Sequence, residues 1–94
     1  MSIDVSVVVV TYNSRNVIGA CLESLRQHTT GVSYDVVVVD NASPDGTADL
    51  VEREYPWARL IRRRTNGGLS AAINDGVSAT AGRNVMQLNP DVRV

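Results

Sequence analysis

Two carboxylates in this chain follow short apolar runs, where a polar ligand could reach them. Asp40 comes directly after the run Tyr34–Val39, and Asp91 follows the run Asn84–Leu88 by three residues. In open parallel sheets, ligands bind beyond the carboxyl ends of the strands, near the point where the strand order reverses. Carboxylates can accept hydrogen bonds there or hold a divalent cation. The pattern therefore predicts a polar ligand site built from strand ends.

Other polar, turn-forming residues also follow the apolar runs. The complete set is Thr11-Tyr12-Asn13, Asp40-Asn41, Arg62–Asn66 and Asn89-Pro90-Asp91. The turn after the first run reads TYNSRN and contains no glycine, so the Rossmann fingerprint and the Walker phosphate loop are both absent. A pyrophosphate bound here needs another positive partner, and a divalent cation held by carboxylate is the obvious candidate.

The apolar runs alternate with segments of helical periodicity. We expect strands at Val5–Thr11, Tyr34–Val39, Trp57–Arg62 and Asn84–Leu88. The continuous valine runs are typical of strands covered on both faces. Alternation of this kind predicts a three-layer α/β/α fold with a mostly parallel sheet of strand order 3-2-1-4. The fourth strand would be an open edge, which would suit a truncated domain or an oligomer formed through that edge.

Each expected helix has a start signal or an apolar stripe. The first should begin at Asn13 or Ser14 and end near His28, as judged from caps and apolar spacing. Ser43 followed by Pro44 predicts the N-cap and first turn of a second helix that reaches Glu54. The third should open at Asn66-Gly67-Gly68. Its core-facing stripe is Leu69, Ala72, Ile73, Gly76 and Val77.

Length and composition bound the classes of function. The chain has 94 residues and a formal net charge of -1, which fits one small domain and gives no field that would gather nucleic acid or anionic lipid. The single cysteine, Cys21, offers no disulfide or metal-ligand pair, and we expect it to be buried. No secretory signal or membrane-spanning run is visible, so we expect a cytoplasmic chain, with a membrane anchor in a longer parent left open.

Four motifs carry a family resemblance. The segments VSVVVVTYN, VVVVDNASPDGT, TNGGLSAAINDGVSATAG and MQLNPDVRV occur along the chain in this order. Together they resemble the family 2 glycosyltransferases of GT-A type, and most closely a bacterial branch that includes rhamnosyltransferase-like enzymes. The resemblance covers almost all of this chain but only the first part of the family's catalytic domain. It implies that residues 1–94 form the N-terminal nucleotide-sugar-binding portion of a truncated GT-A, Rossmann-like domain.

The resemblance also implies nucleotide-binding roles. Thr11 and Tyr12 would line the nucleotide pocket, with Tyr12 beside the base or ribose. Asp40 would hydrogen-bond the base, and its position at a strand end suggests that its removal would largely spare folding. Asn66 and Gly67 would approach the nucleotide.

The metal site is implied by the last motif. Asn89-Pro90-Asp91 replaces the family's Asp-x-Asp, so Asp91 would ligate Mn²⁺ or Mg²⁺ that bridges the diphosphate of the donor. Asn89 would contribute to nucleotide binding, although the neutral side chain lacks the charge of the family's first aspartate.

Purely structural roles remain open for the same residues. Asp40 could cap the turn that follows it, and Asn66 could be only the N-cap of the third helix. Tyr12 could be a half-buried wall residue, and Asp91 could be a plain turn residue. The run Arg62–Arg64 is more often a solvated surface than a phosphate clamp.

The implied activity is that of an inverting, metal-dependent hexosyltransferase. It would pass a sugar from a UDP-, dTDP- or GDP-sugar to a glycan, lipid or polysaccharide acceptor. No residue of the chain is a convincing general base, so we expect no catalytic residue here and donor binding only. The alternative is a non-catalytic nucleotide-binding or assembly module. A receiver-like regulator is disfavoured, because Thr11-Tyr12-Asn13 stands where a receiver has an acidic cluster.

Overall fold

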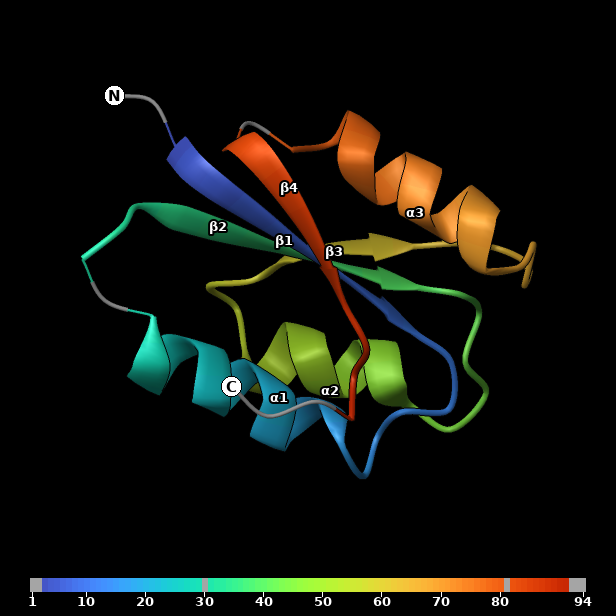
Figure 1. Ribbon diagram of the computed structural model, residues 1–94. Coiled ribbons are helices and arrows are strands. Elements are labelled where there is room, and N and C mark those ends of the chain that lie inside the picture. The colour runs from blue at the N-terminus through green and yellow to red at the C-terminus, as the bar shows by residue number, and fades with distance from the viewer. Residues whose placement is uncertain (1–2, 30, 81, 92–94) are drawn as a thin grey trace.

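The computed structural model describes residues 3–29, 31–80 and 82–91. In chain order the elements are β1 (Ile3–Thr11), α1 (Ile18–His28), β2 (Tyr34–Asp40), α2 (Thr47–Glu54), β3 (Arg59–Arg62), α3 (Leu69–Ser78) and β4 (Gly82–Leu88). The strands form one parallel sheet in the order β3-β2-β1-β4 (Figure 1). The predicted alternation, strand order and parallel pairing are confirmed.

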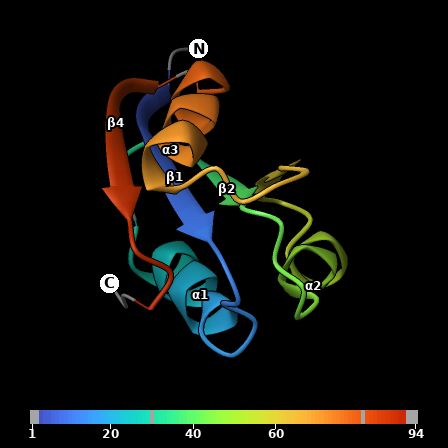
Figure 2. The ribbon, with the colours of Figure 1, turned by 90° about the vertical axis from the view of Figure 1, so that its right-hand side faces the viewer.

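The sheet lies between two helical layers. Helices α1 and α2 cover one face and α3 covers the other (Figure 2). Side chains alternate between the faces along β1: Val7 and Val9 pack toward α1, whereas Val8 and Val10 pack toward α3. Because both faces are covered, every valine from 7 to 10 is buried, which explains the unbroken apolar run.

The helix starts differ from those expected. Helix α2 begins at Thr47 and not at Pro44, because Gly46 adopts a left-handed φ of 86° and interrupts the turn. Asp45, and not Ser43, bonds to the first residue of the helix, since Thr47 N–H donates to Asp45 Oδ1 over 3.0 Å. Helix α1 begins at Ile18, a few residues later than predicted, although Ser14 O still accepts the first turn's N–H from Ile18.

The strands differ from the predictions mainly at their starts. β3 begins at Arg59 and not at Trp57, because Ala58 N–H bonds to Tyr55 O and closes a turn there. β1 and β4 each begin two residues earlier than expected.

The predicted core stripe of α3 is only partly correct. Ala72 and Gly76 are buried, but Leu69 is 56% exposed and Val77 is 42% exposed. Gly76 lies so close to the sheet that a Cβ there would come within 2.5 Å of Val8 Cγ1. This close approach places α3 over β1 and β2, and the apolar side chains of Leu69 and Val77 are left exposed.

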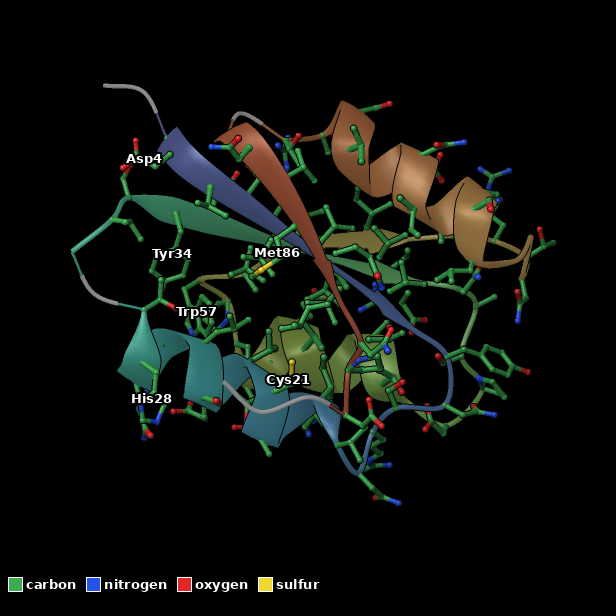
Figure 3. All side chains as sticks on the ribbon, in the orientation of Figure 1. Asp4, Cys21, His28, Tyr34, Trp57 and Met86 are labelled. Carbon is green, nitrogen blue, oxygen red and sulfur yellow. The ribbon has the colours of Figure 1, made fainter. Side chains whose placement is uncertain are left out.

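Cys21 of α1 is fully buried on the side of the helix that faces the sheet, as predicted (Figure 3). On the outer strand, Val85 and Met86 are both exposed, and in the described residues β4 pairs only with β1. Among those residues, no helix is both long and apolar enough to cross a bilayer.

Candidate functional site

The carboxyl ends of β1 and β2 lie side by side. Thr11 and Asp40 are register partners at the last pair of the two strands. The loops that follow them lie at the same edge of the sheet as the start of α3 (Figure 1). The strand order reverses between β1 and β4, so this edge includes the switch point at which open α/β sheets bind ligands.

Asp40 joins the two strand ends. Its Oδ1 accepts hydrogen bonds from Thr11 Oγ1 over 2.7 Å and from Ser43 Oγ over 2.6 Å, and its Oδ2 accepts one from Ser43 N–H over 3.0 Å. The residue is only 3% exposed. Asp40 therefore caps the turn that follows it. Because it is also buried, its position at a strand end is no reason to expect that its removal would spare folding.

Thr11 and Tyr12 differ in how they face this edge. The side chain of Thr11 is fully buried and its hydroxyl is committed to Asp40. Tyr12, the next residue, is 49% exposed. The exposed ring of Tyr12 is the aromatic surface available at the edge, whereas Thr11 acts on the site by orienting the carboxylate.

Further hydrogen bonds cross-link the loops after β1 and β2. Asn13 N–H donates to Ser43 Oγ over 2.9 Å, and Ser14 N–H donates to Thr47 Oγ1 over 3.1 Å. Arg15 N–H donates to Asp45 Oδ2 over 3.2 Å. Partial burial acts to raise the pKa of Asp45, but hydrogen bonds from Thr47 and Arg15 outweigh it and lower that pKa below its usual value. Both loops are thus held to one another.

Backbone strain is concentrated in these two loops. Asn13 and Ala42 are the non-glycine residues with positive φ in the described chain, at 51° and 62°. Asparagine tolerates the left-handed region, but alanine adopts it rarely and at a cost. A strained residue is retained where the surrounding contacts fix it, and such positions cluster at ligand sites.

The loop before α3 is attached to the end of β2 by Asn41. Gly67 N–H donates to Asn41 Oδ1 over 3.2 Å, and Asn41 Nδ2 donates to Gly68 O over 3.1 Å. The N-cap of α3 is Gly68 and not Asn66, so the alternative that Asn66 caps the helix is wrong. Asn66 instead accepts a hydrogen bond from Gly68 N–H over 3.0 Å. The sequence pattern does not predict this role of Asn41. The one signal for it is an amide side chain directly after the end of a strand.

The arginine run is largely bound within the chain. Arg62 pairs with Asp49 and Glu52 of α2, and Arg63 pairs with Asp75 of α3 over 2.6 Å. These contacts brace the helices against β3 and the loop that follows it. The run is therefore less solvated than expected, because carboxylates of the chain pair with two of its three guanidinium groups.

The segment after β4 is more exposed than the other loops. Asn89 and Asp91 are both exposed, and Asn89 Oδ1 accepts a hydrogen bond from Gln87 Nε2 over 3.3 Å. The segment lies beside α1, since Cys21 Sγ contacts Asn89 O at 3.9 Å. Burial, and to a smaller extent the negative charge of Asp91, raise the pKa of the Cys21 thiol.

These residues fit a metal only in part. No group of three or more histidine, cysteine, aspartate or glutamate side chains in the described residues could hold an ion. A single exposed carboxylate, Asp91, fits a cation that draws its other ligands from phosphate oxygens and water.

Comparison with known proteins identifies the family. The model of glycosyl transferase family 2 matches residues 6–94. The chain belongs to this family. The succinoglycan biosynthesis protein ExoO of Rhizobium meliloti is 40% identical over 89 residues, and the dolichol-phosphate mannosyltransferase of Pyrococcus furiosus is 33% identical over 92. The matches cover 94% and 95% of this chain but 25% and 26% of those proteins, so the chain spans about a quarter of their length.

Solved structures of glycosyltransferases share the fold. The mannosyltransferase PcManGT from Pyrobaculum calidifontis, in complex with GDP-Man and Mn²⁺, superposes with a TM-score of 0.84 at 29% identity, covering 97% of this chain and 28% of that one. TarS 1-349 of S. aureus, in complex with UDP, gives 0.83 at 32% identity, covering 94% and 27%. The GT-A fold expected from the motifs is therefore confirmed.

Family membership leaves the roles of single residues as predictions. The structure brings Thr11, Tyr12, Asp40 and the Asn66-Gly67 loop to one edge of the family 2 fold, held together by Asn41. Asn89 and Asp91 follow β4, the strand on the other side of β1.

Proposed function

We propose that this chain is the donor-binding part of a family 2 glycosyltransferase and that its carboxyl edge binds the nucleoside diphosphate of a sugar donor. The observation that carries the proposal is the state of Asp40. This carboxylate is buried at a strand end and oriented by Thr11 and Ser43 before any ligand arrives, and the half-exposed Tyr12 directly follows the end of the neighbouring strand β1. An oriented carboxylate next to an aromatic face suits a nucleotide base.

Asp40 retains capacity for a ligand. A carboxylate has about four acceptor positions, and the neighbours of Asp40 fill three of them. The remaining position, on Oδ2, would accept an N–H of the base. Tyr12 would cover the flat face of the base or ribose, because an aromatic ring gains free energy from such contact. The backbone at Asn66 and Gly67 would face the nucleotide from the third loop.

Asp91 would hold the divalent cation, with Asn89 as a neutral neighbour that contacts the ribose or the metal. Mn²⁺ or Mg²⁺ held there would supply positive charge that stabilises the leaving diphosphate. The exposed position of Asp91 fits a site completed by the ligand itself. Support comes from PcManGT, whose structure contains both Mn²⁺ and a nucleotide sugar.

The parent enzyme would be an inverting transferase of hexosyltransferase type, with a glycan, lipid or polysaccharide acceptor. We propose that its general base and acceptor site lie outside residues 1–94, in a cytoplasmic or membrane-associated parent. The rhamnosyltransferase-like branch and a UDP-, dTDP- or GDP-linked donor belong to the same proposal. On this account the 94-residue chain binds the donor but transfers nothing.

Calorimetry with UDP, dTDP and GDP in the presence of Mn²⁺ tests donor binding. We expect one nucleotide to bind more tightly than the others and more tightly than inorganic pyrophosphate, which has the phosphates without the base. Absence of binding, or equal affinity for pyrophosphate, would contradict the proposal. A transfer assay with the matching sugar donor should stay blank, and sugar transfer by this chain would overturn donor binding alone.

A further inference from the structure

The Asn41 side chain joins two loops of the candidate site through one amide. Its Oδ1 accepts from Gly67 N–H over 3.2 Å and its Nδ2 donates to Gly68 O over 3.1 Å. A backbone N–H can only donate and a carbonyl can only accept, so this pair of partners fixes which way the amide points. The residue is 3% exposed, so neither group is readily replaced by water.

Two further contacts hold the same loop, in addition to the bonds from the Asn41 amide. Arg63 N–H donates to Asp40 O over 2.9 Å, which ties the start of the loop to the end of β2. A Cβ on Gly67 would meet Arg63 Nη2 at 2.6 Å, so the guanidinium lies directly against the loop. Gly68 has a φ of 89°, which side chains rarely adopt. The Asn41 amide thus bonds to the two residues that directly precede α3, Gly67 and its N-cap Gly68.

We propose that Asn41 is a positioning residue that sets the Asn66–Gly68 loop at a fixed place beside Asp40, so that both segments meet the nucleotide together. The inference rests on the proposed function for its effect on binding, but the positioning itself does not. Asn41 reaches the ligand only through the backbone of Gly67 and Gly68. Only an amide of this length supplies a donor and an acceptor at the same two points.

Asn41→Ala and Asn41→Asp separate the two bonds. Alanine removes both. Aspartate keeps an acceptor for Gly67 N–H but places a carboxylate oxygen against Gly68 O, and this repulsion disappears when the new carboxyl is protonated and can donate. The charged groups near the loop include Asp40, Arg63, the Asp75 that pairs with Arg63, and the exposed Arg64 of the same segment, so the wild type is titrated in parallel to account for them.

Hydrogen exchange of the Gly67 amide, measured by NMR on the 94-residue chain, tests the positioning directly. We expect exchange at Gly67 to rise about tenfold or more in Asn41→Ala, while the amide of Leu50, bonded to Gly46 O at the start of α2, changes little. Unchanged exchange at Gly67, or an equal rise at both amides, would overturn the inference. If the alanine variant does not fold, the ratio of Gly67 to Leu50 exchange in Asn41→Asp, taken relative to wild type, is measured instead. It should be higher at pH 8 than at pH 5, and an equal relative ratio at both pH values would overturn the inference.

Nucleotide affinity tests the consequence for binding. With UDP, dTDP or GDP, whichever the wild type binds, Asn41→Ala should weaken binding about tenfold. The affinity of Asn41→Asp relative to wild type should recover as the pH falls from 8 to 5. Asn84→Asp, which adds the same charge at an exposed position near the amino end of β4, should match wild type. An affinity of Asn41→Ala equal to wild type, or a flat relative profile for Asn41→Asp, would contradict the inference. A wild type that binds none of the three nucleotides refutes the proposed function, whereas Gly67 exchange still decides the role of Asn41.

Discussion

The loops after β1 and β2 are built differently from the segment after β4. Hydrogen bonds from Thr11, Asn13 and Ser14 connect the first loop to the second, and Asp40 is buried at their junction. After β4, Asn89 and Asp91 are exposed, and the only side-chain bond of Asn89 in the described residues joins it to nearby Gln87. One side of the site is fixed by the chain alone, whereas the described residues of the other side make few contacts that would fix it.

This difference separates two kinds of recognition. A preformed carboxylate costs little ordering when a base binds, so it favours one base over another. Hard cations such as Mg²⁺ usually bind through one or two carboxylates together with phosphate oxygens and water, so a lone exposed carboxylate suits a cation that arrives with phosphate. We infer that the β1–β2 side selects the base and that the β4 side responds to the diphosphate and metal.

The largest expected effect on stability comes from Asp40→Ala. The change leaves the buried hydroxyl of Thr11 without its acceptor and frees Ser43, so the free energy of unfolding should fall by about 1–3 kcal/mol. Nucleotide binding should weaken as well. Urea denaturation measures the loss, and Asp49→Ala, which removes an exposed ion pair with Arg62, is the matched control with about 0–1 kcal/mol. Equal effects of the two variants would remove the contrast between the loops and an ordinary surface.

Asp45→Asn should change how stability depends on pH. The pKa of Asp45 is lower in the folded chain than in the unfolded one, so its carboxylate adds stability above about pH 4 and that stability is lost as the pH falls through the folded pKa. The asparagine variant should therefore be less stable than wild type at pH 7, and the two should converge in acid. Thermal unfolding at pH 7 and pH 3 measures this. A difference that stays constant across this range would mean that the carboxylate charge is not involved.

Ala42→Gly should be stabilising by about 0.5 kcal/mol, because glycine relieves the left-handed φ of 62° but loses more entropy on folding. Urea denaturation of both chains gives the sign. A clear loss of stability would show that the methyl group of Ala42 contributes contacts that outweigh the strain.

Asp91→Asn should have the smallest effect on stability. Its side chain is exposed, so the free energy of unfolding should change by less than about 0.5 kcal/mol. A loss comparable to that of Asp40→Ala in the same denaturation experiment would show that the segment after β4 is also preorganised.

The sequence predicts the layers and the strand order well, because buried valine runs and helical spacing act along the chain. It predicts the element starts less well. Helix α2 begins at Thr47 because Gly46 adopts a left-handed φ and Asp45 bonds to Thr47 N–H. The sequence offers Ser43-Pro44 as an equally plausible start signal, so the pattern alone does not distinguish the two. The exposure of Leu69 and Val77 depends on how closely Gly76 lets α3 approach the sheet, which periodicity does not encode.

The site was predictable in part for a related reason. Asp40 and Tyr12 follow apolar runs, so their place at the carboxyl edge can be deduced from the alternation alone. The bonds from Asn41 to Gly67 and Gly68 join residues 26 or 27 positions apart, and such pairs depend on the tertiary packing of α3. The nucleotide and metal roles of single residues are implied by the family motifs, because their chemistry depends on a ligand that the alternation of strands and helices does not specify.

Calorimetric titration of the preferred nucleoside diphosphate, with Mn²⁺ and with a chelator, tests the central claim most directly. Wild type should bind more tightly with Mn²⁺, and Asp91→Asn should lose that gain while keeping the metal-independent affinity that the β1–β2 side provides. Equal affinity with Mn²⁺ and with chelator in the wild type, or an undiminished Mn²⁺ gain in Asp91→Asn, would contradict the division of the site into a preformed base side and a ligand-completed metal side.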